Sequence, residues 1–307
     1  MIHSNEAGNE TFDPNVKVWV NGAVVPRSEA RISVFDSGFV LGDGVWEGLR
    51  LEQGKLLFVD AHLDRLEEGA RALFFDLGMT RAELVRAMYE TAHANGFRDH
   101  AHLRLMVTRG ERARPYQSPK LALGKATVVI IPEAREPDHA LLDRGVKMFT
   151  VHVRRGYPDT QDPKLNSHSK LNCITACIQE QQAGADEGLM LDPHGFVATG
   201  NSTHFFLVRR GEVWTSTGRY CIAGITRANI LRACRDAGIP TFERDFSLTE
   251  AHGADEAFTT GTYAGVVHVR ELDGRVFGNG GAGPMVTRIR SLYRALVERE
   301  IAAAVSP

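Results

Sequence analysis

The first 131 residues contain short apolar runs, some of them alternating with polar positions, and this pattern predicts β-strands. The first two runs flank Asn21-Gly22, a dipeptide typical of the two-residue turn of a β-hairpin. Glycines break the runs that follow. The predicted strands cover residues 16–20, 23–25, 30–52, 102–110 and 126–132.

Two segments among these strands have a helical period instead. Residues 61–78 form an amphipathic pattern, and the helix is expected to end at Gly78. A second helix is expected to begin at the capping residue Thr80 and to end at Gly96. Together with the strands, these helices predict a first α/β domain over residues 15–131.

A charged segment with two prolines, residues 132–144, is expected to link this domain to a second one, residues 145–307. A helix is predicted where Leu171, Ile174 and Ile178 follow helical spacing. The fold class is therefore α/β (α+β) in two domains, without the regular βαβ units of a dinucleotide-binding fold. The further elements predicted in the second domain are strands at 145–153, 188–192, 205–210, 212–216 and 256–269, and helices at 226–238 and 283–300.

Composition and charge exclude several classes of function. The net charge of −2 gives no basic surface for nucleic acid, and no run of 18 or more apolar residues predicts a membrane span. The first 14 residues are polar and lack the apolar core of a signal peptide, so we expect a mobile tail on a cytoplasmic protein. The four cysteines lack CxxC spacing, which favours reduced thiols over a disulfide or a metal site.

Three short motifs contain groups that can bind an anion. In AGITRAN, residues 223–229, a glycine precedes Thr226 at the start of an amphipathic helix, where free backbone N–H groups attract negative charge. FTTGT, residues 258–262, adds hydroxyl groups at a strand end, and HLDRL, residues 62–66, contains Arg65. Each motif alone also fits a helix cap or a solvated charge, so the three indicate an anion site only in combination.

In this order along the chain, the motifs resemble those of the class IV, or fold type IV, pyridoxal-phosphate aminotransferases. That group includes branched-chain aminotransferases, D-amino-acid transaminases, (R)-amine transaminases and aminodeoxychorismate lyases. The resemblance implies a two-domain fold type IV α/β enzyme that uses pyridoxal 5'-phosphate and forms a homodimer. It covers residues 18–295 and rests on WVNG (19–22), FDSGFVLGDGVWEGLR (35–50), HLDRL (62–66), TRG (108–110), ADEGLMLDPHGFV (185–197), GITR (224–227) and DEAFTTGT (255–262).

The resemblance also implies roles for individual residues. Arg65 corresponds to the arginine that binds the cofactor phosphate bidentately. Arg104 lies near a substrate-side arginine of branched-chain enzymes, and Arg114 resembles the carboxylate-binding arginine of D-amino-acid transaminases, although either also fits a surface charge. The other implied phosphate ligands are Ile225, Thr226 and Thr262, and the other implied substrate-side residues are Trp46, Tyr263 and Ala264.

The lysine that such an enzyme needs for its covalent bond to the cofactor can be matched in two conflicting ways. A match without gaps through residues 153–166 places Asn166 at the lysine position. Matching SKLN to the family's K-x-L-N makes Lys170 the catalytic residue, with Lys164 as a further alternative. If a helix runs through both Asn166 and Lys170, they share one face about 6 Å apart along its axis. We therefore predict Lys170.

A second departure from the family pattern is Thr199, which stands where the family usually has a glutamate that keeps the pyridine nitrogen protonated. A threonine hydroxyl offers only a neutral hydrogen bond, so the ring would be a weaker electron sink. The sequence predicts an aminotransferase that acts on a small or branched-chain amino acid and a 2-oxo acid. A lyase of the aminodeoxychorismate type and a non-catalytic relative that binds phosphate ligands are the alternatives.

Overall fold

The computed structural model describes residues 13–135 and 138–303, so the tail predicted over residues 1–14 lies outside the described residues except for its last two. The chain divides into two compact units. The described residues of the large unit are 138–164 and 170–299, and those of the small unit are 13–135, 165–169 and 300–303. The short segment 165–169 thus belongs to the small unit, although its neighbours on both sides belong to the large one.

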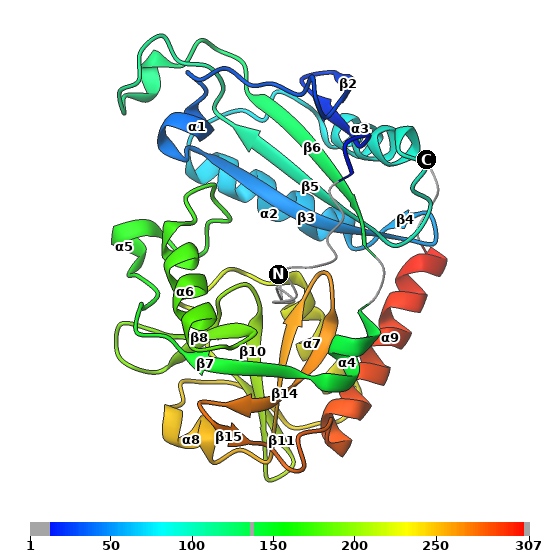
Figure 1. Cartoon of the computed structure of the whole chain (residues 1–307), viewed down its shortest axis with the longest axis vertical. Coiled ribbons are helices and arrows are strands. Elements are labelled where there is room, and N and C mark those ends of the chain that lie inside the picture. The colour runs from blue at the N-terminus through cyan, green and yellow to red at the C-terminus, as the bar shows by residue number, and fades with distance from the viewer. Residues whose placement is uncertain (1–12, 136–137, 304–307) are drawn as a thin grey trace. The chain divides into compact units, whose positions relative to one another are not determined.

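The small unit contains an antiparallel six-stranded sheet with the strand order β2-β1-β6-β5-β3-β4 (Figure 1). The predicted hairpin is confirmed, because Asn21 and Gly22 both have positive φ angles, +47° and +103°, as a type I′ turn requires. Pairing of β3 with β5 sets Gly48 opposite Arg104. The strands are β1 Lys17–Val20, β2 Ala23–Pro26, β3 Gly44–Glu52, β4 Lys55–Leu56, β5 Ala101–Thr108 and β6 Thr127–Ala134.

Helices α2, Val59–Ala72, and α3, Arg81–Ala94, pack on one face of this sheet and form the core of the small unit with it. The second predicted helix start is confirmed, because Thr80 caps α3 through a capping box. The first predicted helix is shorter than expected: Phe74 has a φ of +55°, which a right-handed helix cannot accommodate, and α2 ends before it. The remaining helical turns of this unit are α1 Ser37–Leu41 and the 3₁₀ turn Pro119–Leu121.

The large unit contains a nine-stranded mixed sheet with the path β12-β11-β10-β13-β14-β7-β8-β9, and β15 also pairs with β14. The hydrophobic core of this unit includes Phe205, Trp214 and Phe246. The strands are β7 Val146–Thr150, β8 Glu187–Leu191, β9 Val197–Gly200, β10 His204–Arg209, β11 Glu212–Thr215, β12 Thr241–Glu243, β13 Glu256–Gly261, β14 Gly265–Leu272 and β15 Arg275–Val276.

The helix predicted after Lys170 is confirmed as α6, but its apolar stripe does not face the core of its unit. Leu171, Ile174 and Ile178 are 75%, 53% and 49% exposed, whereas Ala176 and Glu180 are buried. The helices of the large unit are α4 His139–Arg144, α5 Pro158–Gln161, α6 Leu171–Gln182, α7 Ile225–Asp236, α8 Leu248–His252 and α9 Pro284–Ala303, the last of which ends in the small unit.

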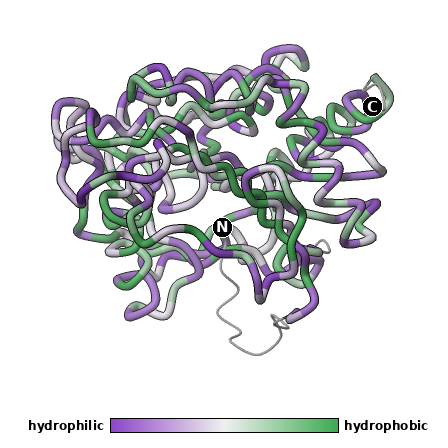
Figure 2. The backbone as a smooth tube through the Cα atoms, turned by 90° about the horizontal axis from the view of Figure 1, so that it is seen from above, coloured by the Kyte–Doolittle hydropathy of each residue, from purple (hydrophilic) through white to green (hydrophobic). Residues whose placement is uncertain are grey.

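Hydrophobic and hydrophilic segments are interspersed along the traced backbone (Figure 2). Over residues 13–135 and 138–303, no helix combines the length and the apolar composition needed to cross a membrane.

Candidate functional site

The start of helix α7 in the large unit has the properties of an anion-binding cup. Gly224 is the N-cap and its extended backbone offers no side chain to cap the helix. The first N–H groups of a helix have no acceptor within the helix, and the helix dipole places partial positive charge there. Ile225 and Thr226, both predicted phosphate ligands, are the first two helical residues, and Thr226 is buried.

The His204 side chain on β10 packs against Gly224 in this cup. A Cβ atom at position 224 would lie 2.2 Å from the His204 ring, so only glycine lets the loop pack so closely. The imidazole Nε2 also lies 3.0 Å from the carbonyl oxygen of Ile222. These contacts fix the backbone immediately before α7.

Thr260 adds a buried hydroxyl without a partner on the same face of the sheet. It lies directly opposite His204 in the pairing of β13 with β10, so the two side chains are neighbours. Thr260 is 1% exposed, and its Oγ1 makes no hydrogen bond within the described residues. A buried hydroxyl without a partner is costly unless a ligand satisfies it. The cup therefore fits a phosphate group.

Three sequence-predicted residues lie in the turn that joins β13 to β14. Thr262, Tyr263 and Ala264 follow the end of β13 at Gly261 and are all partly exposed. They come two to four residues after Thr260 and so belong to the same end of the strand.

Thr199 lies on β9 and is 4% exposed. Its hydroxyl donates a hydrogen bond of 2.7 Å to the carbonyl oxygen of Thr203. With its proton engaged, Thr199 Oγ1 can accept a hydrogen bond but cannot donate one to a second group. It is thus suited to a protonated ring nitrogen, to which it brings no charge of its own.

In the small unit, Arg65 is bound to a carboxylate that the sequence analysis did not assign. Its Nε and one terminal nitrogen donate to the two oxygens of Glu47, both at 2.7 Å, and His62 Nδ1 contacts the same carboxylate at 2.7 Å. Burial acts to raise the pKa of Glu47, but the Arg65 guanidinium and the hydrogen bonds outweigh it and hold the pKa below its usual value. Burial lowers the pKa of His62. Glu47 therefore orients Arg65.

The substitution Glu47→Ala is expected to lower the free energy of unfolding by about 3 kcal/mol, because it leaves the Arg65 guanidinium without its bidentate acceptor. Urea denaturation measures this. The control Glu67→Ala removes the partner of Arg81 and Arg71 on the surface and should cost less than about 1 kcal/mol. Equal losses for both variants would show that the Glu47 carboxylate has no special role in the small unit.

Trp46 and Arg104, both predicted on the substrate side, do lie together. The Arg104 guanidinium carbon is 4.2 Å from the centre of the Trp46 ring, a cation–π contact. His102 shares this face of the sheet, two residues before Arg104. Burial, followed by the positive charges of Arg104 and Arg135, lowers the pKa of His102 to about 3, so its ring is neutral. Arg104 is therefore a positively charged group on this face of the sheet, next to the rings of Trp46 and His102.

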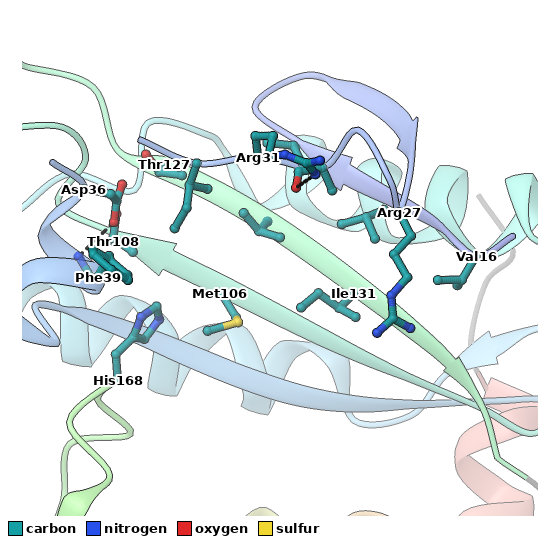
Figure 3. A pocket seen from close by; sticks show the side chains of 16 residues that line it. Val16, Arg27, Arg31, Asp36, Phe39, Met106, Thr108, Thr127, Ile131 and His168 are labelled. Carbon is teal, nitrogen blue, oxygen red and sulfur yellow. Dashed lines mark hydrogen bonds between the residues drawn. The ribbon is translucent and has the colours of Figure 1, made fainter. Parts of the chain in front are cut away.

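A pocket of about 520 Å³ lies on the same sheet face of the small unit. Met106, two residues after Arg104, belongs to its lining, and Val129 lies directly opposite it on β6. Figure 3 shows Arg27 at one end of the pocket and Asp36 with Thr108 at the other. The floor between them is apolar, formed by Val18, Val20, Met106, Val129 and Ile131.

The stretch that contains the predicted lysine divides between the units. Asn166 belongs to the small unit, is 7% exposed and donates a hydrogen bond of 2.5 Å from its side chain to the carbonyl oxygen of Trp46. Lys170 is the N-cap of α6 and is partly exposed, whereas Lys164 is exposed. Because α6 begins at Leu171, no helix runs through both Asn166 and Lys170, and the condition for a shared helical face is not met.

Arg114, the alternative carboxylate-binding arginine, is exposed in the loop after β5. The buried arginine of that loop is Arg112, whose guanidinium donates to Ser37 Oγ at 3.1 Å and to the carbonyl oxygens of Tyr116 and Ser118. Sequence reasoning also missed Glu47. Its signal was present in the motif DGVWEGLR, where an acidic residue interrupts an otherwise apolar strand.

The sequence matches the family model described as "Amino-transferase class IV" over residues 44–272. It is 39% identical to branched-chain-amino-acid aminotransferase-like protein 2 of Arabidopsis thaliana over 97% of this chain and 55% of that protein. The chain thus spans about half the length of the Arabidopsis relatives that it matches.

Two further relatives are matched over nearly their whole length. The branched-chain-amino-acid aminotransferase of Pseudomonas aeruginosa is 30% identical over 91% of this chain and 92% of its own. The crystal structure of the branched-chain aminotransferase from the archaeon Thermoproteus uzoniensis with norvaline is 30% identical and superposes with a TM-score of 0.83. That match covers 93% of this chain and 95% of the other.

Proposed function

Because the chain belongs to the class IV aminotransferase family, we propose that it binds pyridoxal 5'-phosphate and moves an amino group between a small or branched-chain amino acid and a 2-oxo acid. The observation that carries the proposal is the cup at the start of α7, with its uncapped N–H groups and the partnerless hydroxyl of Thr260. When bound, the cofactor supplies an aldehyde for the incoming amine and a ring that withdraws electrons.

In the large unit, the N–H groups of Ile225 and Thr226 and the hydroxyls of Thr260 and Thr262 are the proposed phosphate ligands. In the small unit, Glu47 orients Arg65, for which the family resemblance proposes a phosphate-binding role. Guanidinium groups and helix N-termini are both well suited to phosphate oxygens.

Lys170 is the proposed catalytic base. Its amine Nζ is proposed to take the proton from the substrate Cα atom. Thr199 is the proposed partner of the ring nitrogen, as an acceptor.

Two features of the small unit support the proposed substrate, a small or branched-chain amino acid. Arg104 offers a positive charge for a carboxylate, and the apolar floor of the neighbouring pocket suits a hydrocarbon side chain. Tyr263 and Ala264, in the large unit, are proposed as substrate-side residues by the family resemblance. We also propose a homodimer, which the exposed apolar stripe of α6 supports.

The test is to add pyridoxal 5'-phosphate to the purified protein and to record its absorbance before and after borohydride. Amine transfer from leucine, valine and alanine to 2-oxoglutarate is then assayed. The proposal predicts a visible band that borohydride abolishes, together with amine transfer. A protein that takes up no cofactor contradicts it.

The substitution Arg104→Leu is expected to raise the KM for the 2-oxo acid about 10- to 100-fold, because it removes the charged partner of the substrate carboxylate. Cofactor uptake should not change. The matched control is Arg114→Leu in the exposed loop, which should leave KM within about twofold of the wild type. If Arg114→Leu raises KM and Arg104→Leu does not, the carboxylate site has been assigned to the wrong arginine.

A second candidate function is the binding of a phosphate ligand without amine transfer. It is favoured by the buried Asn166 side chain, which is bound to the Trp46 carbonyl oxygen. The match to the family without gaps places Asn166 at the position of the catalytic lysine. This reading predicts phosphate-dependent uptake of the cofactor with no band that borohydride abolishes.

A further inference from the structure

Two carboxyl groups are buried together in the large unit, close to Thr199. Glu180 on α6 is 1% exposed and Glu187 on β8 is 0% exposed. The proposed function assigns no role to either of them. Burial of two acidic groups in one place requires a specific reason, because each charged form is costly away from water.

Glu187 holds the loop that follows β9. Its Oε1 accepts the backbone N–H of Ser202 at 2.6 Å and the hydroxyl of Thr203 at 3.2 Å, and its Oε2 accepts the Ser202 hydroxyl at 2.8 Å. The fit around Gly200 is equally close, because a Cβ there would lie 2.8 Å from Glu187 Oε1. The carboxylate therefore fixes the path of residues 200–203.

Glu180 accepts the backbone N–H of Gly188, the residue that follows Glu187 on β8. The groups that face it are Cys177 on its own helix, Glu187 on β8 and the Asn201 side chain in the loop. Burial, followed by the charge of Glu187, raises the pKa of Glu180 to about 7. Burial also raises the pKa values of Glu187 and of Cys177, the latter to about 11. The three groups that donate to Glu187, the Ser202 N–H and the Ser202 and Thr203 hydroxyls, favour its charged form.

A short chain of hydrogen bonds connects this charge to Thr199. The Thr203 hydroxyl donates to Glu187, and the Thr203 carbonyl accepts the hydroxyl of Thr199. The orientation of the Thr199 oxygen is therefore set by the loop that Glu187 anchors.

We propose that Glu180 and Glu187 act as a positioning pair, which orients Thr199 and supplies from behind it the negative charge that a carboxylate at position 199 would supply directly. The inference rests on the proposed function, in which Thr199 faces the ring nitrogen of the cofactor. A negative charge behind Thr199 favours the protonated ring nitrogen over the neutral one. It would do so less strongly than a carboxylate in direct contact, because the interaction weakens with distance.

The first measurement needs no cofactor and follows stability against pH. Glu180 keeps its proton up to about pH 7 in the folded protein, whereas in the unfolded chain it loses the proton near its ordinary pKa of 4.5. Stability should therefore fall as pH rises between these values. In Glu180→Gln this fall should be smaller than in the wild type. The control Glu298→Gln makes the same change at an exposed site and should keep it. If stability falls as much with rising pH in Glu180→Gln as in the wild type, the proposed role of the pair is wrong.

The second measurement uses 4'-deoxypyridoxine 5'-phosphate, which carries the phosphate and the ring nitrogen but no aldehyde, so no lysine is involved. Its absorbance reports ring protonation when it is bound. We expect the double variant Glu180→Gln/Glu187→Gln to lower the proton affinity of the bound ring about tenfold or more. Thr199→Glu in that background should restore it. Equal proton affinity in the wild type and the double variant overturns the inference alone, whereas failure of the wild type to bind the probe overturns the proposed function as well.

A single variant keeps the test decisive if the double variant does not fold. Thr199→Glu in the wild-type chain adds a third carboxyl near the pair, so it should lose stability above pH 7. The loss should be smaller when Glu180→Gln is also present. Equal losses with and without Glu180→Gln overturn the inference.

Discussion

Replacing Lys170 with alanine is expected to lower the rate of amine transfer by about 10³-fold or more, because the reaction loses both its covalent partner and its proton carrier. Uptake of pyridoxamine 5'-phosphate should remain, since the cup at the start of α7 is unchanged. The measurements are steady-state amine transfer and, after borohydride treatment, peptide mapping of the modified lysine.

The matched control for this prediction is Lys164→Ala, which removes an exposed lysine from the same stretch. It should retain amine transfer within about twofold of the wild type. If Lys170→Ala keeps the borohydride-sensitive band and Lys164→Ala loses it, the catalytic lysine is Lys164. If the wild type itself never forms the band, then the chain binds the cofactor without a covalent bond, as the buried Asn166 favours.

Much of the fold follows from the sequence because its signals are local. The Asn21-Gly22 turn and the Thr80 cap depend on a few neighbouring residues, and both are present as predicted. The end of α2 was not predictable in the same way, because Gly78 is a stronger stop signal in the sequence than Phe74, where the chain in fact turns. The exposed stripe on α6 shows a further limit: helical spacing identifies the helix but not which face meets the core.

The candidate site is less accessible to sequence reasoning, since its decisive contacts join residues far apart in the chain. His204 is found below the start of α7 only once β10 is placed, and Thr260 becomes its neighbour only through strand pairing. The Glu47–Arg65 pair joins a strand to a helix 18 residues later. Motif resemblance proposed Arg65, Ile225 and Thr226 as phosphate ligands, but it did not point to Glu47, His204 or Thr260.

The substitution Thr226→Asp is expected to weaken binding of pyridoxal 5'-phosphate about 100-fold or more while leaving the empty protein folded. Thr226 is the second residue of α7, where a carboxylate interacts favourably with the helix dipole and with the free N–H groups. The same charge occupies the place of a phosphate oxygen and repels a dianionic ligand. Cofactor affinity should therefore fall far more than the stability of the empty protein, which a general disruption of the fold cannot produce.

The control for this prediction is Thr226→Ser, which keeps the hydroxyl and should bind the cofactor within about threefold of the wild type. Thermal unfolding without ligand and titration with pyridoxal 5'-phosphate measure the two effects separately. Because repulsion between charges is screened by salt, the loss of affinity in Thr226→Asp should become smaller as ionic strength rises. If Thr226→Asp binds the cofactor as tightly as Thr226→Ser, then the phosphate does not lie at the start of α7, and the cup that carries the proposed function has another purpose.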